Sequence, residues 1–329
     1  MARPQSPRGV TVLGECVADA FVDPAGSRPG ELALRALPGG GPANTAVALA
    51  RLGTPTRFLG RFSGDAFGTL FRARLAASGV DLTGSVAASE ASTLAVADLD
   101  ETGQATYTFY ADSAADWQWT ADELAATRQH DAVCLHTGSL ALIRQPGGRH
   151  IEDHLAQTRE HATVSIDPNV RPLLVPPATY RERLPRWCAL ADILRLSEDD
   201  LALLLPGAGP EQACDTWHAA GVRLVVITLG GRGAVASLDG VRVTVPAPAV
   251  DVVDTVGAGD SFTAGLLHRL AVLGHLGGRL DGLSLDDITD ACSFAARVSA
   301  LTCSVPGANP PRADEAAPEG DVRLLLPHA

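Results

Sequence analysis

The sequence contains no lysine, so all 26 of its cationic side chains are arginines. This absence excludes a phosphate-binding loop of the Gly-x-x-x-x-Gly-Lys type, and arginine, backbone amides or a metal ion must neutralise any bound phosphate. The sequence also lacks a run of basic residues, and its net charge is −12. That charge argues against nucleic acid and anionic membranes as partners.

Cysteines and long apolar runs are scarce as well. The six cysteines are scattered through 329 residues without a Cys-x-x-Cys pair, which is typical of buried free thiols in a reducing compartment. No apolar run is long enough to span a membrane, and the polar, proline-rich N-terminus lacks the apolar segment of a secretion signal. We therefore expect a soluble protein of the cytoplasm.

Short apolar segments alternate with amphipathic stretches along most of the chain. Stretches such as Arg149–His161 and Glu211–Ala220 predict helices. The apolar segments predict strands at Val10–Gly14, Thr56–Leu59, Ala132–Leu135, Thr163–Ile166, Ile193–Leu196 and Leu224–Thr228. This alternation predicts an α/β fold, a three-layer αβα sandwich in which helices cover both faces of a mostly parallel sheet. We expect residues 1–329 to form a single domain.

One part of the chain does not fit the parallel core. Thr93–Asp98 and Ala105–Tyr110 are alternating segments rich in β-branched and aromatic residues, and Gly103 lies between them, which predicts a hairpin. Together with the segment after Asp19, this hairpin predicts a small β lid built from residues of about 20–38 and 90–112. One face of the lid would cover a site, and the other would meet solvent or a partner.

The stretch from Asp254 to Phe262 indicates the chemistry. Gly257 and Gly259 allow backbone N–H groups to converge, and the apolar pattern after them predicts a helix whose positive end faces the same point, which suits a phosphate. A carboxylate at Asp260 opposes a bound phosphate unless its task is to accept a proton from an attacking hydroxyl. The alternative is a glycine-rich turn in which Asp260 is an ordinary cap.

Further polar clusters follow predicted strands. Asp19 comes shortly after the first strand, Asp167-Pro168-Asn169 follows another, and Thr228–Gly231 follows a third. Ligands of open parallel sheets bind beyond the carboxyl ends of the strands, so we expect these clusters to converge there with the Asp254–Asp260 loop.

Two of these motifs carry a family resemblance. Asp-Thr-Val-Gly-Ala-Gly-Asp-Ser-Phe, from Asp254 to Phe262, resembles the C-terminal signature of the ribokinase-like (PfkB) sugar kinases, and the segment from Gly39 to Gly53 resembles their N-terminal signature. The resemblance spans about Val10 to about Asn309. It implies a ribokinase-like fold, ATP and Mg²⁺ as cofactors, and Asp260 as the catalytic base. The amides of Gly257, Ala258 and Gly259 would form an anion hole, and Arg171 would contact the transferred phosphoryl group.

The resemblance also implies a sugar site. Asp19 would accept hydrogen bonds from two sugar hydroxyls, and Phe109 or Tyr110 would form an apolar wall in the lid. Further contacts are expected from residues that match the glycine-rich and Asp-Pro-Asn motifs: Gly39, Gly40, Gly41, Asn44 and Asn169. From the residues alone, the alternative for Asp19 is an exposed carboxylate at a strand end, and the alternative for Arg171 is an exposed arginine after a turn.

On the nucleotide side, the resemblance implies contacts to ATP from Ser197, Thr228, Gly230, Gly231, Gly233, Thr255 and Asn309. Ser197 and Asp200 stand where many relatives carry Asn-x-x-Glu, a motif tied to Mg²⁺ and phosphate. A helix capping box explains the same two residues without a metal, and Asp200 would otherwise contact Mg²⁺ through water. Asp254 and Val256 would bind a monovalent cation such as K⁺.

Within the family, the N-terminal signature and Thr108-Phe109-Tyr110 look most similar to fructokinases. We therefore expect an ATP-dependent sugar kinase with fructose as acceptor. The alternatives are a ribokinase, a 2-keto-3-deoxygluconate kinase, a nucleoside kinase, or a catalytically weak sugar-binding regulatory protein. Many relatives pair their lids, so we also expect a homodimer through the β lid.

Overall fold

The computed structural model describes residues 9–99, 105–127 and 132–317. The largest sheet formed by these residues contains β1 (Gly9–Leu13), β4 (Thr56–Leu59), β9 (Ala132–Gly138), β10 (Thr163–Asp167), β11 (Ile193–Ser197), β12 (Leu224–Thr228), β13 (Ala234–Leu238) and β14 (Val241–Val245). The strand order is β14-β13-β12-β11-β10-β9-β1-β4. Neighbours from β4 to β12 pair in parallel, and β13 and β14 add two antiparallel strands at the other edge. The predicted mostly parallel sheet is confirmed.

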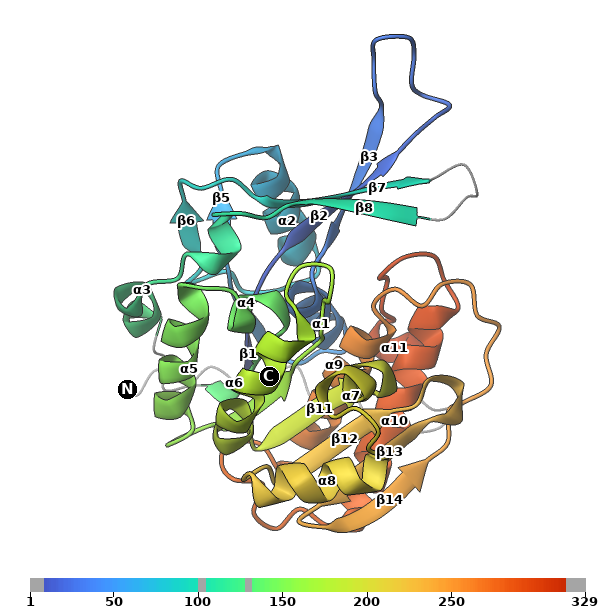
Figure 1. Ribbon diagram of the computed structural model, residues 1–329. Coiled ribbons are helices and arrows are strands. Elements are labelled where there is room, and N and C mark those ends of the chain that lie inside the picture. The colour runs from blue at the N-terminus through green and yellow to red at the C-terminus, as the bar shows by residue number, and fades with distance from the viewer. Residues whose placement is uncertain (1–8, 100–104, 128–131, 318–329) are drawn as a thin grey trace, which may run out of the picture.

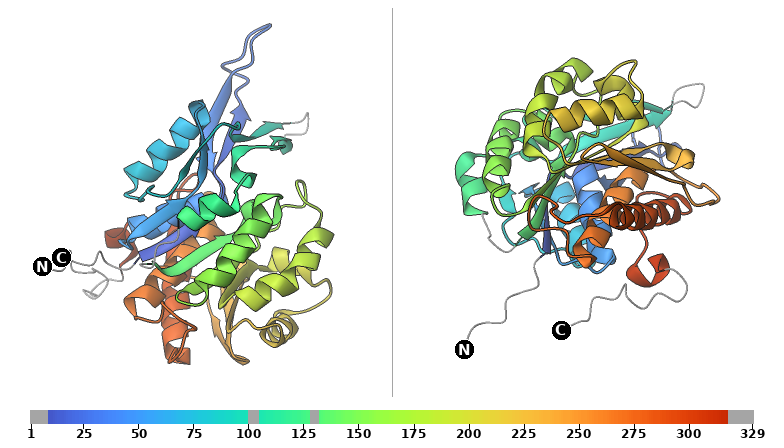
Figure 2. Two further views of the ribbon diagram at one scale, coloured as in Figure 1. Left: turned by 90° about the vertical axis from the view of Figure 1, so that its left-hand side faces the viewer. Right: turned by 90° about the horizontal axis from the view of Figure 1, so that it is seen from below.

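Helices cover both faces of this sheet (Figures 1 and 2). One face carries α1 (Gly41–Arg51), α9 (Ala258–Val272) and α10 (Leu285–Cys303), and the other carries α5 (Gly147–Thr158), α6 (Pro177–Leu190), α7 (Glu198–Leu204) and α8 (Pro210–Ala219). The shorter helices are α3 (Ala121–Ala126), α4 (Ser139–Ile143) and α11 (Ala313–Ala316), and α2 (Ala66–Ala77) lies beside the smaller sheets. The predicted three-layer αβα sandwich is therefore confirmed.

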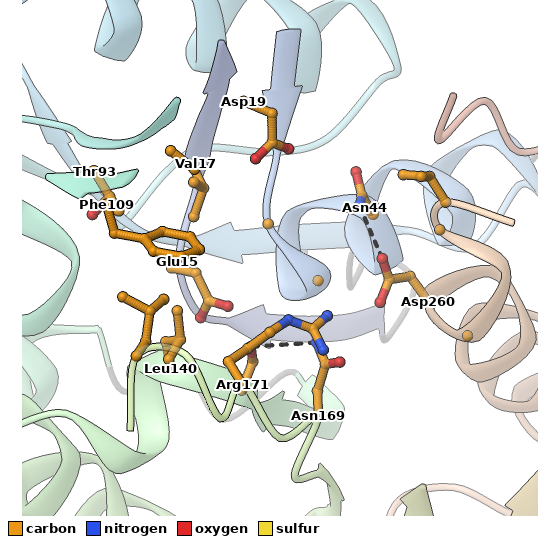
Figure 3. A pocket seen from close by; sticks show the side chains of 18 of the residues that line it. Glu15, Val17, Asp19, Asn44, Thr93, Phe109, Leu140, Asn169, Arg171 and Asp260 are labelled. Carbon is orange, nitrogen blue, oxygen red and sulfur yellow. Dashed lines mark hydrogen bonds between the residues drawn. The ribbon is translucent and has the colours of Figure 1, made fainter. Parts of the chain in front are cut away.

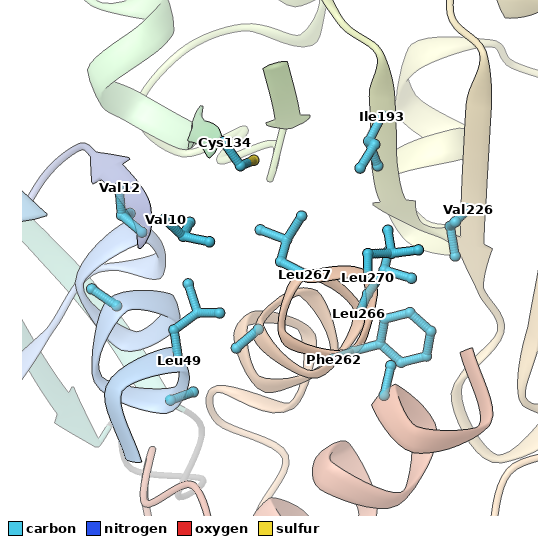
Figure 4. Packing of buried hydrophobic residues seen from close by; sticks show 14 of the residues in the cluster. Val10, Val12, Leu49, Cys134, Ile193, Val226, Phe262, Leu266, Leu267 and Leu270 are labelled. Carbon is cyan, nitrogen blue, oxygen red and sulfur yellow. The ribbon is translucent and has the colours of Figure 1, made fainter. Parts of the chain in front are cut away.

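Alternation along the strands directs side chains to one helical layer or the other. Val10 and Val12 belong to the cluster under α1 and α9, whereas Leu13 belongs to the cluster under α4 to α8. Figure 4 shows Leu267 and Leu270 of α9 directed toward the sheet. Burial on both sides explains why these strands read as nearly continuous apolar segments.

A second sheet projects from the core (Figure 1). It contains β2 (Val17–Val22), β3 (Leu34–Gly39), β7 (Thr93–Leu99) and β8 (Ala105–Tyr110) in the order β3-β2-β7-β8. The predicted hairpin is confirmed by the antiparallel pairing of β7 with β8, whereas β2 pairs with β7 in parallel. The expected position of Gly103, in the connection, lies outside the described residues. A two-stranded sheet of β5 (Arg61–Ser63) and β6 (Val86–Ala88) completes this part.

Two expectations need correction. Asp19 does not follow the end of a core strand, because the chain starts a new strand at Val17 and Asp19 lies inside β2. The segment Ile193–Leu196, predicted as a continuous apolar strand, contains Arg195. The side chain of Arg195 is buried all the same, at 5% exposure. Among the described residues, none of the helices has both the length and the apolar character needed to cross a membrane.

Candidate active site

The start of helix α9 forms the floor of the site. Gly257 is its N-cap and has a left-handed backbone, with φ of 78°, which favours glycine. A side chain there would also meet Ala308, whose Cβ lies 2.8 Å from the position of an added Cβ. Asp260 is in the first helical turn. The loop and the positive end of a 15-residue helix therefore point toward one place, as an anion requires.

A cavity of about 370 Å³ lies between the second sheet and the carboxyl ends of the core strands. Figure 3 shows Asp19, Asn44 and Asp260 directed into the same space. We call this cavity the sugar-side pocket. The predicted site residues that line it are Asp19, Gly40, Gly41, Asn44, Phe109, Asn169, Arg171, Thr255, Val256, Gly257, Gly259 and Asp260. Residues far apart in the sequence thus meet where the polar clusters were expected to converge.

Asp260 and Asn44 form a hydrogen-bonded pair inside this pocket. The Asn44 Nδ2 donates to Asp260 Oδ2 at 2.9 Å. Removal from water raises the pKa of Asp260 to about 6, although the Asn44 hydrogen bond and the nearby Arg171 and Arg195 lower it and Asp167 raises it further. Asp260 is therefore ionised at neutral pH, with a pKa closer to that pH than an exposed aspartate has, as suits a proton acceptor.

Arg74 of helix α2 fixes the orientation of the Asn44 amide. Its Nη2 donates to Asn44 Oδ1 at 3.3 Å and to the Ala308 carbonyl at 2.6 Å. Its Nη1 donates to the Pro38 carbonyl of β3 at 2.6 Å. Because the amide oxygen faces Arg74, the amide nitrogen faces Asp260. The sequence analysis did not identify Arg74, which belongs to neither signature.

Asp19 is partly buried in β2, so the exposed alternative does not describe it. Burial raises the pKa of Asp19 to about 6, and the positive charges of Arg171 and Arg74 oppose that rise. Gly39 is not among the residues that line the cavity. It makes room for Asp19, because a Cβ at this position would lie 2.1 Å from Asp19 Oδ2.

Two buried acids near Asp19 were missed by the sequence analysis. Glu15 lines the pocket at 1% exposure, and its Oε2 accepts a hydrogen bond from the Ala141 N–H at 3.1 Å. Burial raises the pKa of Glu15 to about 7. Asp116 accepts hydrogen bonds from the Cys16 N–H and the Thr93 hydroxyl, and burial raises its pKa to about 6. For Glu15 the available signal was an acid directly after the apolar segment Val10–Gly14.

A second cavity, of about 260 Å³, lies on the other side of the α9 start. We call it the nucleotide-side pocket. The predicted residues that line it are Thr228, Gly230, Gly231, Gly233, Thr255, Ala258 and Gly259. Positive φ values of 57° at Gly230 and 95° at Gly233 explain the glycines of this turn. Apolar side chains and the face of α10 form much of the remaining wall, as a small-molecule site requires.

The first-turn amides divide between the two cavities. Gly257 lines the sugar-side pocket, whereas Ala258 lines the nucleotide-side pocket and donates its N–H to the Thr255 carbonyl at 3.2 Å. Gly259, Thr255 and Arg195 line both pockets. The two cavities therefore adjoin at the start of α9. Arg195 was missed because it interrupts a predicted apolar strand, and that interruption was the signal for it.

Three expected contacts are not found in these cavities. Tyr110 is 61% exposed and, by strand alternation, lies on the face of β8 opposite to Phe109. Asn309 accepts a hydrogen bond through Oδ1 from Arg51 at 2.6 Å, away from the nucleotide-side pocket. Ser197 caps helix α7 instead of lining that pocket.

The expected metal contacts are largely engaged with the protein. Asp200 completes the predicted capping box with Ser197, and its Oδ1 accepts from the Val170 N–H at 2.8 Å. Asp254 accepts from the N–H groups of Val256 and Gly307 at 3.0 and 2.8 Å, which ties two loops together. Within the part of the chain that the structure describes, no three or more His, Cys, Asp or Glu side chains gather as metal ligands.

The sequence pattern of the pfkB family carbohydrate kinases matches residues 8–315. The chain belongs to this family. It is 36% identical over 258 residues to a fructokinase of Rhizobium leguminosarum bv. trifolii, which covers 78% of either chain.

Solved structures of this family share the fold. A fructokinase from Xylella fastidiosa with bound ATP superposes with a TM-score of 0.85 at 28% identity, covering 94% of this chain and 97% of that one. A double mutant of a fructokinase from Vibrio cholerae O395, in a form with bound fructose, ADP and potassium ion, gives a TM-score of 0.77 at 30% identity. That match covers 93% of this chain and 95% of the other. The predicted ribokinase-like fold is thus confirmed.

Proposed function

We propose that this pfkB family carbohydrate kinase transfers the γ-phosphoryl group of ATP to a hydroxyl of fructose. The observation that carries the proposal is the junction of the two pockets at Arg195, Thr255 and Gly259, with Asp260 on the sugar side. A phosphoryl group leaving the nucleotide-side pocket enters the sugar-side pocket beside Asp260, a carboxylate that can accept the proton of the attacking hydroxyl.

The residues of the sugar-side pocket divide the work. Asp19 and Asn44 offer the acceptor and donor groups that bind sugar hydroxyls. The attacking hydroxyl oxygen forms a bond to the γ-phosphorus while Asp260 accepts its proton and ADP departs with the electrons of the broken bond. The backbone at Gly257 and Gly259 meets the negative charge of the phosphoryl group at the helix start.

Both a relative found by sequence similarity and a relative found by structural similarity support fructose as the acceptor. The Rhizobium relative is named a fructokinase. The solved structure of the Vibrio cholerae fructokinase double mutant contains bound fructose and ADP. In this chain Phe109 supplies an apolar wall across the pocket from Asn44 and Asp260 (Figure 3). A mixed lining of this kind suits a sugar, which has apolar C–H faces and a polar rim.

The proposed cofactors are Mg²⁺ with ATP, and K⁺. Proteins hold Mg²⁺ through one or two carboxylates together with substrate phosphates and water. Asp200, already engaged in its cap, fits contact through water. Mg²⁺ would neutralise phosphate charge. The loop held by Asp254 near Val256 would bind K⁺, an ion present in the Vibrio structure.

The proposal extends to the molecule as a whole. We take the chain as one kinase domain in which the second sheet acts as the lid, and two lids pair in a homodimer. Exposed apolar side chains on that sheet support the pairing, among them Leu34 at 47% and Tyr110 at 61%. A cytoplasmic location fits the cysteines of the described residues, all of which are free thiols.

ADP release across a panel of sugars, with and without Mg²⁺, tests the function. We expect fructose to give the highest kcat/KM and turnover to require Mg²⁺. The Asp260→Asn variant should still bind fructose and ATP while kcat falls by roughly a hundredfold or more, the usual size of a general-base contribution. Asp122→Asn, at an exposed position of α3, is the matched control. A kcat of Asp260→Asn close to that of the unaltered protein contradicts the base assignment.

A further inference from the structure

Arg195 occupies the junction of the two pockets. On β11 it shares the α9 face of the sheet with Ile193, and its guanidinium carbon lies 5.6 Å from the centre of the Phe262 ring. It lines both the sugar-side and the nucleotide-side pocket. By contrast, Arg171 lines only the first of these, and its Nη1 donates to the Val170 carbonyl at 3.3 Å.

The guanidinium of Arg195 is held by two acceptors. Nη1 donates to Asp167 Oδ2 at 2.8 Å, and Nη2 donates to Thr228 Oγ1 at 2.7 Å. A guanidinium has five N–H donors in a fixed plane, so these two bonds leave donors unused. Nε has no partner among the described residues. The group is therefore oriented before a ligand arrives and is not fully satisfied by the protein.

Gly259 lets this guanidinium approach the helix start. A Cβ on Gly259 would lie 2.8 Å from Arg195 Nη1, so any side chain there would collide with the guanidinium or push it away. Within the Gly257-Ala258-Gly259 motif, the second glycine thus brings a cation and the positive end of α9 to one point.

We propose that Arg195 is a catalytic residue that donates hydrogen bonds to the phosphoryl group during its passage from ATP to the sugar. This assignment rests on the proposed function. The bond from the sugar oxygen to phosphorus forms as the bond from phosphorus to ADP breaks. During this step the equatorial oxygens of the phosphoryl group carry negative charge while the group lies between the nucleotide-side and the sugar-side pocket. A cation that lines both pockets contacts those oxygens throughout the transfer, whereas Arg171 meets them only on the acceptor side.

Arg195→Gln removes the charge and keeps a polar side chain. We expect kcat to fall by roughly a hundredfold or more, the range found when a donor to transition-state charge is lost, with smaller changes in the KM values for sugar and ATP. Arg195→Lys should restore part of the loss. Arg149→Gln, an exposed arginine of α5, is the control and should not change kcat.

A binding measurement separates direct contact from support of the fold. Fluoroaluminate imitates the phosphoryl group in transfer, so calorimetry compares the affinity for ADP with and without fluoroaluminate in the presence of fructose and Mg²⁺. Arg195→Gln should bind ADP alone as the unaltered protein does and lose most of the gain that fluoroaluminate gives. If both affinities fall by the same factor, or kcat is unchanged, Arg195 only supports the fold and the proposal is wrong.

The loss of Arg195 leaves Asp167 as an uncompensated buried carboxylate, which threatens folding. Asp167→Asn combined with Arg195→Gln removes both charges, and this double variant should fold and still lose the fluoroaluminate gain. Retention of the gain in the double variant contradicts the proposal. If the unaltered protein phosphorylates no sugar of the panel, the proposed function fails, while the ADP comparison still tests Arg195.

Discussion

Burial raises the pKa of four carboxyl groups in and beside the sugar-side pocket. The values are about 6 for Asp19, Asp116 and Asp260 and about 7 for Glu15. Carboxyl groups with raised pKa values in a cleft are typical of functional sites. Ionising a buried carboxyl costs free energy, and an apolar side chain at the same position would avoid that cost. The cost is tolerated where the carboxylates bind hydroxyls or accept protons, as proposed for Asp19 and Asp260.

Glu15 allows this cost to be measured. A carboxyl whose folded-state pKa lies above its unfolded value favours folding when protonated, and that contribution is lost as pH rises from about 4.5 to about 7. Glu15→Gln should therefore raise the free energy of unfolding by about 2–3 kcal/mol at pH 8, since each pKa unit corresponds to about 1.4 kcal/mol.

At pH 4.5 the same substitution should change stability much less. Urea unfolding at both pH values provides the measurement, with Glu160→Gln, an exposed glutamate, as the matched control. An equal effect of Glu15→Gln at both pH values would show that Glu15 does not titrate in this range.

The residues that sequence analysis identified and those it missed differ in how they act. Asp260 and Asn44 belong to glycine-rich motifs whose local geometry already indicates an anion or sugar site. Arg195 and Arg74 are positioned by contacts with residues distant in sequence, Asp167 and Asn44. The sequence shows at most that an arginine interrupts an apolar strand, and the fold shows what each arginine contacts. The prediction that Phe109 or Tyr110 faces the sugar named both residues, although alternation allows only one of two adjacent strand residues to face the pocket, and that residue is Phe109.

At the scale of secondary structure, the strands and helices of the core were predictable because burial on both faces gives short apolar strands between amphipathic helices. The path of the chain after β1 was not. Strand β2 pairs with β7, from a segment far along the chain, and this long-range pairing decides that Asp19 lies within a strand. Local patterns carry no information on such a pairing.

Helix α2 connects the parts of the site through Arg74. The side chain joins strand β3 at Pro38, helix α1 at Asn44 and the loop at Ala308. Its positive charge also opposes the raised pKa of Asp19. Arg74→Gln should raise the pKa values of Asp19 and Asp260 toward those of uncompensated buried carboxyls, because a neighbouring cation favours the ionised form.

The proposed mechanism needs both carboxylates ionised. The acidic limb of kcat/KM against pH should therefore move to higher pH in Arg74→Gln, by roughly one unit. Arg74→Lys keeps the charge and should leave the limb in place while losing part of kcat/KM through a less fixed Asn44. An acidic limb at the same pH in all three proteins would contradict a role of Arg74 in the charge of the site.

At the scale of the whole molecule, the two sheets divide the site between them. The core sheet and α9 hold Asp260, Arg195 and the nucleotide-side pocket, and the second sheet holds Asp19 and Phe109. Pocket-lining residues such as Val17, Asp19, Thr93 and Ala95 occupy one face of the second sheet. Its other face exposes Leu34 at the start of β3 and Tyr110 at the end of β8, and Figure 1 shows no helix beside the projecting end of β3.

That outer face carries the last prediction. Leu34 pairs with Val22, and Tyr110 pairs with Leu94, which places both side chains opposite to the pocket-facing residues. Large exposed apolar side chains on a sheet promote association, and a twofold pairing of two such faces forms a closed dimer. Sedimentation at micromolar concentration should give twice the mass of one 34.0 kDa chain. Leu34→Glu combined with Tyr110→Glu should give the monomer, whereas Val241→Glu, at an exposed position of β14, should leave the dimer intact. A monomeric mass for the unaltered protein would rule out pairing through the lid.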